Sequence, residues 1–310
     1  MSRALRIEFP GAIYHMMARG VAQMPVFFDD GDRLALLYEI ANQVRLGVLI
    51  VHAFCLMLNH IHLLCETPYS GLGRIMHDIL GSYASNFNRL HKRSGHLWQG
   101  RYKAILVQDG QYMLNCSRYI HLNPFKAGID TADFTYPWSS YQSYLHNTSF
   151  PWVCTDRILS RSNTPKEYQE FVENQIEDCA NPFELATAGF VYGDQEFVKG
   201  IYQIVHQTGI KGDDQPVIRS LRKAVSVPSI NAVRSAVEAA FPDHAECQKR
   251  RFLVWALHSY TWLKGSEIGR TVGLKRSAVS RIISSFEHMI LVDEIMAKSF
   301  GAVARQLEIL

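Results

Sequence analysis

One stretch limits the possible folds of this chain more than any other: the apolar run from residue 46 to residue 65, which contains three histidines. The run is long enough to suggest a membrane span, but polar residues such as His52 and Asn59 interrupt it. Asn59 also stands where a turn is expected between two shorter apolar segments. We therefore predict two buried strands, 48–56 and 60–66, inside a folded domain.

Two histidines on the second of these strands form the first candidate site. Residues two apart in a strand share a face, so His60 and His62 point the same way and could meet one ion. Residues four apart in a helix also share a face, so Tyr119 and Asn123 would present a phenol and an amide oxygen together. Each part alone has an ordinary structural explanation, because half-buried histidines are commonly satisfied by backbone groups and tyrosines commonly fill cores.

Length and composition indicate a soluble cytoplasmic protein with more than one domain. The chain has 310 residues, 47% of them hydrophobic and 20% charged, which is ordinary for folded proteins. Its beginning has no apolar signal core, and no membrane association is predicted. The 6 cysteines are scattered without a Cys-x-x-Cys pair, as expected for a reducing compartment.

Positive charge is concentrated in two segments although the net charge is only +3. Residues 74–126 contain eight Lys and Arg against Asp78 and Asp109, and residues 249–281 contain eight against Glu267. Such clusters predict two basic patches that suit a phosphate backbone. Solvated helix faces are the alternative explanation.

The order of the predicted elements points to an α+β domain. Apolar residues at helical spacing after Asp29 predict a helix that ends at Gly47. A strand, this helix and two further strands favour a ferredoxin-like antiparallel sheet with helices on one side. Pro124 directly follows Asn123 and biases it away from helical angles. The predicted elements are strands over 13–18, 48–56, 60–66 and 104–107, and helices over 29–47, 70–91 and 109–122.

The remainder of the chain is predicted to be mostly helical. We place a first domain at 1–148, a helical connector and linker at 149–230, and a last domain at 231–310. Gly and Pro residues make 208–229 a candidate flexible linker. In the last domain, Gly269, Gly273 and Val279 have the spacing of a helix-turn-helix, with a helical hairpin used only for packing as the alternative.

Several motifs resemble one transposase family. Tyr14–Gly20, Val26–Asp30 and Met57–His62 resemble the single-tyrosine HUH transposases. Gly95–Tyr102 and Arg118–Pro124, followed by Pro137–Tyr141, are similar to the branch called REP-associated tyrosine transposases. The segment Phe252–Ile290 more loosely resembles the DNA-binding domain of the bacterial replication initiator. The resemblance implies the HUH sheet for about half of the chain.

The resemblance also implies a chemistry for the candidate site. Tyr119 would attack a phosphodiester, while His60, His62 and Asn123 would hold a divalent ion, Mg²⁺ or Mn²⁺ in this family. The product would be a 5′-phosphotyrosine with a free 3′-hydroxyl. Two imidazoles and an amide suit softer ions better than Mg²⁺ by ligand type. His121 is a candidate general base only if it turns towards Tyr119.

DNA is the predicted partner, either single-stranded or folded into a hairpin. Cations interleaved with aromatic side chains can bind phosphates and stack unpaired bases, although Trp98 could equally fill the core. Duplex DNA is a further expectation for the last domain, and the protein is expected to be a monomer or a dimer. The predicted DNA-binding residues are Arg19, Arg89, Lys92, Arg93, His96, Trp98, Arg101, Tyr102, Arg118 and Lys126, with Arg276, Ser277, Ser280 and Arg281 in the last domain.

Two alternatives to a transposase remain. The chain could be a domesticated DNA-binding regulator with little or no cleavage activity, in which the last domain binds duplex DNA. It could also be a replication or plasmid-transfer nickase, which shares the HUH chemistry. His60, His62, Tyr119 and Asn123 are all present, which disfavours complete loss of activity, and the segment from Gly95 to Asn123 favours the transposase branch.

Overall fold

The computed structural model describes residues 7–130, 133–146, 150–162, 164–174, 176, 179–207, 228–261, 263, 265–292, 302–303 and 306–307. Contacts divide the chain into two compact units, and the border falls in α8 (Gln195–Gln207), after Val198. Each unit is described by itself below. Most of the predicted linker, residues 208–227, lies outside the described residues. No described helix is long and apolar enough to cross a bilayer.

A five-stranded sheet in the order β2-β3-β1-β4-β5 forms the centre of the first unit. The pairs among the first four strands are antiparallel, and β5 lies parallel to β4. The α+β class with a helical carboxy-terminal region is confirmed, but the sheet is mixed rather than purely antiparallel. The strands are β1 (Ala12–Arg19), β2 (Ile50–Met57), β3 (His60–Thr67), β4 (Lys103–Val107) and β5 (Val191–Tyr192).

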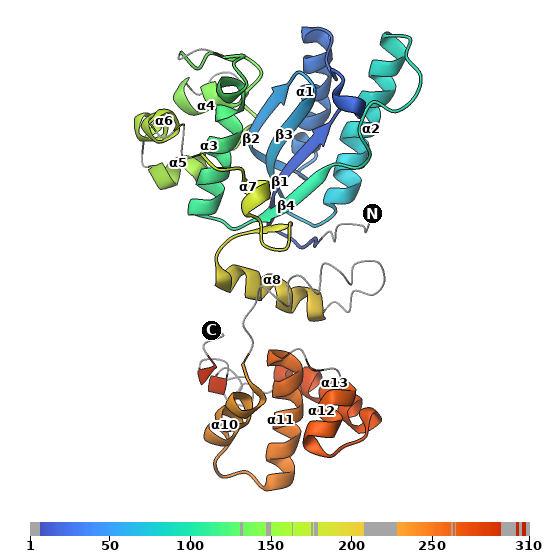
Figure 1. Cartoon of the computed structure of the whole chain (residues 1–310), viewed down its shortest axis with the longest axis vertical. Helices are drawn as coiled ribbons and strands as arrows, with labels where there is room; N and C mark the ends of the chain where they lie inside the picture. The colour runs from blue at the N-terminus through green and yellow to red at the C-terminus, as the bar shows by residue number, and fades with distance from the viewer. Residues whose placement is uncertain are drawn as a thin grey trace. The chain divides into compact units, whose positions relative to one another are not determined.

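Helices cover both faces of this sheet. Helix α1 (Asp30–Arg45) packs on α2 (Leu72–Leu90), whereas α3 (Gln111–Lys126) packs on β2 and β3. Figure 1 shows α1 and α2 on one side of the strands and α3, in green, on the other. The prediction of helices on one side was therefore wrong. Sequence periodicity places each helix against the sheet but does not say which face it covers.

Local signals explain where α1 begins. Asp29 caps the helix, because its side chain accepts a hydrogen bond from the Asp32 N–H while the Asp32 carboxylate faces the Asp29 N–H in return. Acidic residues in the first turn also suit the helix dipole. A short 3-10 turn, η1 (Val21–Gln23), precedes α1 and follows β1.

Helix α3 continues through Pro124, contrary to the boundary predicted after Leu122. Proline removes one backbone donor from the helix, but burial of Ile120, Leu122 and Pro124 favours continued packing on the sheet. Asn123 therefore stays one helical turn from Tyr119. The bias that proline exerts on the preceding residue is overridden by tertiary contacts.

The segment after residue 149 packs on the first unit rather than forming a separate connector. The Cys154 N–H donates to the Val51 carbonyl at 2.8 Å, and Arg157 pairs with both Glu66 and Asp109. Strand β5, which the sequence did not predict, adds to the sheet edge. The short helices here are α4 (Tyr141–His146), α5 (Asp156–Ser162), α6 (Pro165–Glu173) and α7 (Pro182–Leu185).

The second unit is helical and has its own apolar core, which includes Val233, Phe252 and Val279. Glycines shape the turn between its last two long helices. Gly273 has a φ of +66°, and a Cβ on Gly269 would lie 2.5 Å from the Leu274 carbonyl oxygen. The helices are α10 (Ile230–Ala240), α11 (Glu246–Tyr260), α12 (Gly265–Val272) and α13 (Arg276–Val292).

Candidate functional site

Three histidines share the face of the sheet that α3 covers. In the antiparallel register, His60 lies opposite Arg19 and His62 lies opposite Met17, so all four side chains are on one face. His15, two residues before Met17, is on this face too. The His60 and His62 ring centroids are 5.0 Å apart. The predicted pairing of two imidazoles is therefore present.

Helix α3 brings Tyr119 to these rings. The Tyr119 ring centroid lies 5.7 Å from that of His62 and 5.8 Å from that of His15, in edge-on arrangements. Asn123 donates from its side-chain amide to the Tyr119 carbonyl oxygen at 2.7 Å. This bond leaves the Asn123 Oδ1 as the amide atom available to a ligand. Tyr119 thus lies beside His62, which in turn lies beside His60, and Asn123 lies one turn from Tyr119 on the same helix.

The hydrogen bonds of both imidazoles use the same nitrogen. The His60 Nδ1 lies 2.7 Å from the Asn59 Oδ1, which can only accept, so Nδ1 carries the proton. The His62 Nδ1 lies 2.9 Å from the His15 Nε2. Among the described residues neither Nε2 has a hydrogen-bond partner. The two Nε2 atoms are therefore the nitrogens that could bind an ion.

Burial keeps the histidines neutral. It lowers the pKa of His60 to about 4, helped by the nearby Arg19 charge. Burial, together with His15, His60 and Arg19, lowers the pKa of His62 well below its usual value. Neutral imidazoles are the form that binds metals. Burial also raises the pKa of Tyr119 to about 12, with smaller contributions from Cys179, Cys116 and Glu184 that exceed the opposing effect of Arg19. The phenol is therefore protonated at neutral pH.

His121 is not the general base. Its Nε2 lies 2.8 Å from the Ser140 Oγ and its Nδ1 lies 2.8 Å from the Tyr168 Oη, in a fully buried network. The Tyr168 hydroxyl in turn donates to the Ser117 Oγ at 2.9 Å. Two residues along α3 from Tyr119, this ring faces a different side of the helix. Burial lowers its pKa to about 3, so it stays neutral and structural.

The donor set fits a divalent ion that takes part of its coordination from elsewhere. No three His, Cys, Asp or Glu side chains within the described ranges form a group that could hold an ion by themselves. Two free imidazole nitrogens and one free amide oxygen leave several positions for water or phosphate oxygens. These three groups are neutral, so an ion held by them would keep its full charge.

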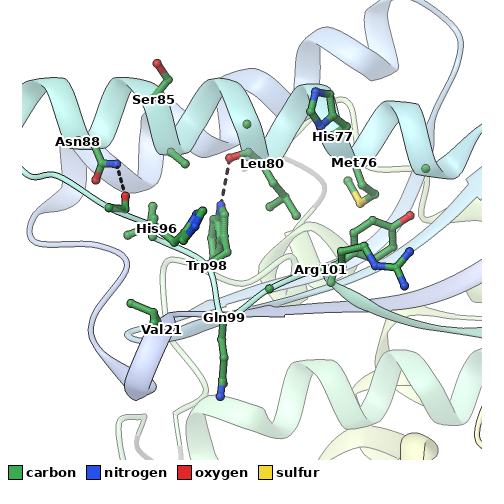
Figure 2. A pocket seen from close by; sticks show the side chains of 17 residues that line it. Val21, Met76, His77, Leu80, Ser85, Asn88, His96, Trp98, Gln99 and Arg101 are labelled. Atoms are coloured by element: carbon green, nitrogen blue, oxygen red, sulfur yellow. Dashed lines mark hydrogen bonds between the residues drawn. The ribbon is translucent and has the colours of Figure 1, made fainter. Parts of the chain in front are cut away.

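The opposite side of the sheet has a cavity of about 760 Å³ between α2 and the loop from Gly95 to Tyr102. Four of the predicted DNA-binding residues line it: His96, Trp98, Arg101 and Tyr102. Figure 2 shows Trp98 directed at α2, where its Nε1 donates to the Leu80 carbonyl at 3.0 Å. Trp98 thus packs on α2, as the core alternative predicted, and it also lines the cavity; its stacking on bases stays a prediction.

Other predicted DNA-binding residues of the first unit have different surroundings. Arg19, Arg89 and Lys92 are exposed, and the Arg93 guanidinium lies over the Phe87 ring at 5.5 Å. Arg118 does not belong to an exposed surface: it is 7% exposed, and its guanidinium lies over the Phe171 ring of α6 at 4.5 Å.

Lys126 is held at the protein surface, because its Nζ donates to the Cys179 carbonyl oxygen at 2.5 Å. Counting charges along the sequence does not distinguish Arg118 and Lys126, which contact other parts of the protein, from exposed cations such as Arg19 and Lys92. In the second unit, Arg276, Ser277, Ser280 and Arg281 are all exposed on the first turns of α13.

His15 is the residue of this site that the sequence analysis did not assign. It stands inside one of the family-like motifs, but its place beside His62 depends on the register between β1 and β3. The sequence contained one signal for this role, because His15 lies on a predicted strand that could pair with the strand of His60 and His62. Phe183 of α7 also covers the His15 ring, at a centroid distance of 4.5 Å, and its segment gave no pattern.

The first unit is an α+β domain with a histidine pair on β3 and a tyrosine on the helix α3 that packs on this strand. Residues 9–123 match the family described as IS200-like transposases. The chain is therefore similar to IS200-like transposases over these residues, all of which lie in the first unit.

Two further comparisons complete the picture. No curated protein sequence matches the chain. Among solved structures, one described as a REP-associated tyrosine transposase bound to a REP hairpin is similar to it, with a TM-score of 0.41 and 16% sequence identity. The similar region covers 50% of this chain and 91% of that one.

Proposed function

We propose that the protein cuts and rejoins single-stranded DNA beside a hairpin, as a transposase of the REP-associated tyrosine type. The observation that carries the proposal is that the Tyr119 ring lies 5.7 Å from the His62 ring, which lies 5.0 Å from the His60 ring. The match to IS200-like transposases supports it, as do the motifs Gly95–Tyr102 and Arg118–Pro124.

In the reaction, the Tyr119 Oη forms a bond to phosphorus while the P–O3′ bond breaks. The phenolic proton leaves and the 3′ oxygen gains one, so no net proton is consumed. The 5′-phosphotyrosine keeps one phosphodiester bond for the one broken, so the 3′-hydroxyl of the same or a second strand can attack its phosphorus and release Tyr119 without ATP. With one tyrosine per site, one strand is cut at a time, which suits a single-stranded substrate.

The His60 Nε2, the His62 Nε2 and the Asn123 Oδ1 would hold Mg²⁺ or Mn²⁺, which would neutralise charge that develops on the phosphate oxygens. The chain itself supplies the remaining functions. Tyr119, whose pKa is raised to about 12, enters as a phenol and must lose its proton during attack. Arg19, which is exposed and lies opposite His60, would bind a phosphate next to the one that reacts.

The cavity between α2 and the Gly95–Tyr102 loop is the proposed binding surface for unpaired bases of the same DNA. Trp98 and Tyr102 offer aromatic side chains, and the exposed Arg101 offers a cation. This cavity and Tyr119 are on different sides of the sheet. A DNA strand that contacts both would therefore have to pass around the sheet at the end of β1. There, the Gln99 N–H donates to the Arg19 carbonyl at 2.8 Å.

The decisive experiment uses Tyr119→Phe and hairpin DNA from the flanks of the protein's own gene, with Mn²⁺. Wild type should give a protein–DNA adduct that survives denaturing electrophoresis. Tyr119→Phe should bind the same DNA with wild-type affinity and form no adduct. Tyr112→Phe, on the same helix, is the matched control and should keep the adduct. Efficient adduct formation by Tyr119→Phe would defeat the proposal.

A second candidate function, duplex-DNA binding by the second unit, is favoured by the α12–α13 turn. Val279 is buried while Arg276, Ser277, Ser280 and Arg281 are exposed on α13, as a recognition helix requires. In the full chain, Arg276→Ala combined with Arg281→Ala should weaken sequence-specific duplex binding without altering the hairpin adduct. Undiminished duplex affinity in this variant would exclude that surface.

A further inference from the structure

We propose that His15 is a positioning residue for the metal site, because its Nε2 accepts the Nδ1 proton of His62 and leaves the His62 Nε2 free for a divalent ion. The inference rests on the proposed function, since it concerns the same site. It assigns a role to a side chain on a neighbouring strand that contributes no ligand of its own.

The register between β1 and β3 produces this contact. His15 pairs with Leu64 and Met17 pairs with His62, so His15 and His62 are diagonal neighbours on one face. Their nitrogens, His15 Nε2 and His62 Nδ1, lie 2.9 Å apart, and the ring centroids lie 5.1 Å apart. The contact therefore follows from the backbone pairing and does not depend on a flexible loop.

Tautomer chemistry decides what the contact does. A neutral imidazole has one N–H and one lone pair, so the His62 Nε2 can bind an ion only when its Nδ1 carries the proton. In that tautomer the His62 Nδ1 donates and the His15 Nε2 must accept. His15 then carries its own proton on Nδ1. Ligand histidines generally have such an acceptor behind them, which fixes ring orientation and tautomer.

The surroundings of His15 indicate a role other than stabilising the fold. The residue is fully buried, and its Nδ1 has no hydrogen-bond partner in the described structure. A buried polar nitrogen without a partner destabilises a protein, so an apolar side chain would pack there at lower cost. The Phe183 and Tyr119 rings, at 4.5 and 5.8 Å, fix the plane of the imidazole. The hydrogen bond to His62 therefore explains a histidine at this position better than a contribution to the stability of the fold does.

The test compares Mn²⁺ affinity in three variants of the full chain without DNA, measured by electron paramagnetic resonance of free Mn²⁺. His15→Leu removes the acceptor and should weaken Mn²⁺ binding about 10- to 100-fold. His15→Gln offers an amide oxygen in its place and should recover most of that loss. Met16→Leu, a buried change on β1 that faces the other side of the sheet, should leave the affinity unchanged.

A second measurement examines the wild-type protein, so that a poorly folded variant does not decide the matter. Nitrogen-15 NMR of the histidine rings in saturating Mg²⁺ should show the His62 Nδ1 protonated and the His15 Nε2 unprotonated. A His62 ring protonated on Nε2 instead would overturn the inference. The same conclusion would follow if His15→Leu bound Mn²⁺ as tightly as wild type.

The two proposals fail in different ways. If His15→Leu binds Mn²⁺ normally and wild type still forms the metal-dependent adduct, His15 has no positioning role and the proposed function stands. If wild type forms no adduct, or forms it equally well in chelator, the proposed function or its metal is wrong. A wild-type protein that binds no Mn²⁺ removes both the metal site and the role of His15.

Discussion

Two faces of α3 carry polar side chains, and they differ in how completely those side chains are satisfied. On the face towards α4 and α6, each nitrogen of His121 has a partner 2.8 Å away, and the Tyr168 and Ser117 hydroxyls continue the network. On the face towards β3, Tyr119 lies beside the His62 ring, and the Nε2 atoms of His62 and His60 have no hydrogen-bond partner within the described structure.

The difference separates a structural polar cluster from a candidate reactive one. A buried network in which every donor has an acceptor rigidifies the protein and has nothing left for a ligand. Free nitrogens and an amide oxygen on a partly open face are what a ligand needs. The saturated face therefore holds α3 in place, and the unsaturated face is available for chemistry.

The largest expected effect concerns the unsaturated face. His62→Ala should lower the rate of metal-dependent hairpin cleavage by about 100-fold or more, because a lost ligand removes the ion that stabilises phosphate charge. His60→Ala should behave in the same way. Cleavage is followed as adduct formation at fixed Mn²⁺, with DNA affinity in chelator as the control for folding. Cleavage by wild type that is equal with and without chelator would contradict the metal role.

The saturated face should respond in stability rather than in chemistry. His121→Leu leaves the Ser140 and Tyr168 hydroxyls without their partner, so the free energy of unfolding should fall by about 2–4 kcal/mol. Urea-induced unfolding measures this change, and Tyr168→Phe should give a smaller loss of about 1–2 kcal/mol. If His121→Leu kept wild-type stability and lost all adduct formation, His121 would belong to the reaction after all.

The pH dependence of the unfolding free energy should reveal the same difference between the two faces of α3. The pKa of His121 is lowered by burial to about 3 in the folded protein, against an ordinary value of 6.5. Between these values the unfolded chain binds a proton that the folded one does not, so stability is full above pH 6.5 and falls as the pH decreases. This residue contributes about 1.4 kcal/mol per pH unit in that window. The slope of unfolding free energy between pH 5 and 6.5 should be shallower by this amount in His121→Leu.

His15 and His60 add to the wild-type slope with the same sign, whereas His52, whose pKa is raised because burial is outweighed by its hydrogen bonds to Cys154 and Glu66, acts in the opposite direction. Burial lowers the pKa of His15 to about 3 and that of His60 to about 4. The comparison between wild type and His121→Leu isolates the one residue. Equal slopes in both proteins would mean that His121 is protonated in the folded state, which its two hydrogen-bond partners do not favour.

The reactive face could be predicted from the sequence because its spacing is local. His60 and His62 are two apart on a strand, and Tyr119 and Asn123 are four apart on a helix, so each pair is fixed by a single element. The order of strands and helices in the first domain followed from periodicity for the same reason. The proline at position 124 caused only an error in the predicted end of the helix, which was placed after Leu122 although α3 runs to Lys126.

The saturated face could not be predicted, because its partners come from distant segments. Ser140 and Tyr168 are 19 and 47 residues from His121 along the chain. The sequence predicts a helical connector around Tyr168, whereas the structure packs this segment on α3. The mixed sheet was missed for a related reason, because β5 has two residues and is defined by its pairing with β4.

The smallest expected effect distinguishes an exposed arginine that could bind DNA from a buried arginine that stabilises the fold. Arg101 is exposed at the cavity, whereas Arg118 is buried on α3 with its guanidinium against the Phe171 ring. Arg101→Ala should weaken hairpin binding and reduce the slope of log affinity against log salt by about 0.7, the value for one phosphate contact on a single strand. Arg118→Ala should leave both quantities unchanged and lower the unfolding midpoint, because it removes packing and a cation–π contact.

Fluorescence anisotropy of a labelled hairpin at several salt concentrations measures both effects, with Mn²⁺ omitted so that no adduct forms. Arg45→Ala, at an exposed position in the last turn of α1 outside the cavity, is the matched surface control. An equal loss of salt slope in Arg118→Ala would require the Phe171 contact to open when DNA binds. The face of α3 described as saturated would then be a DNA surface in the complex, and the division between structural and reactive faces would have to be redrawn.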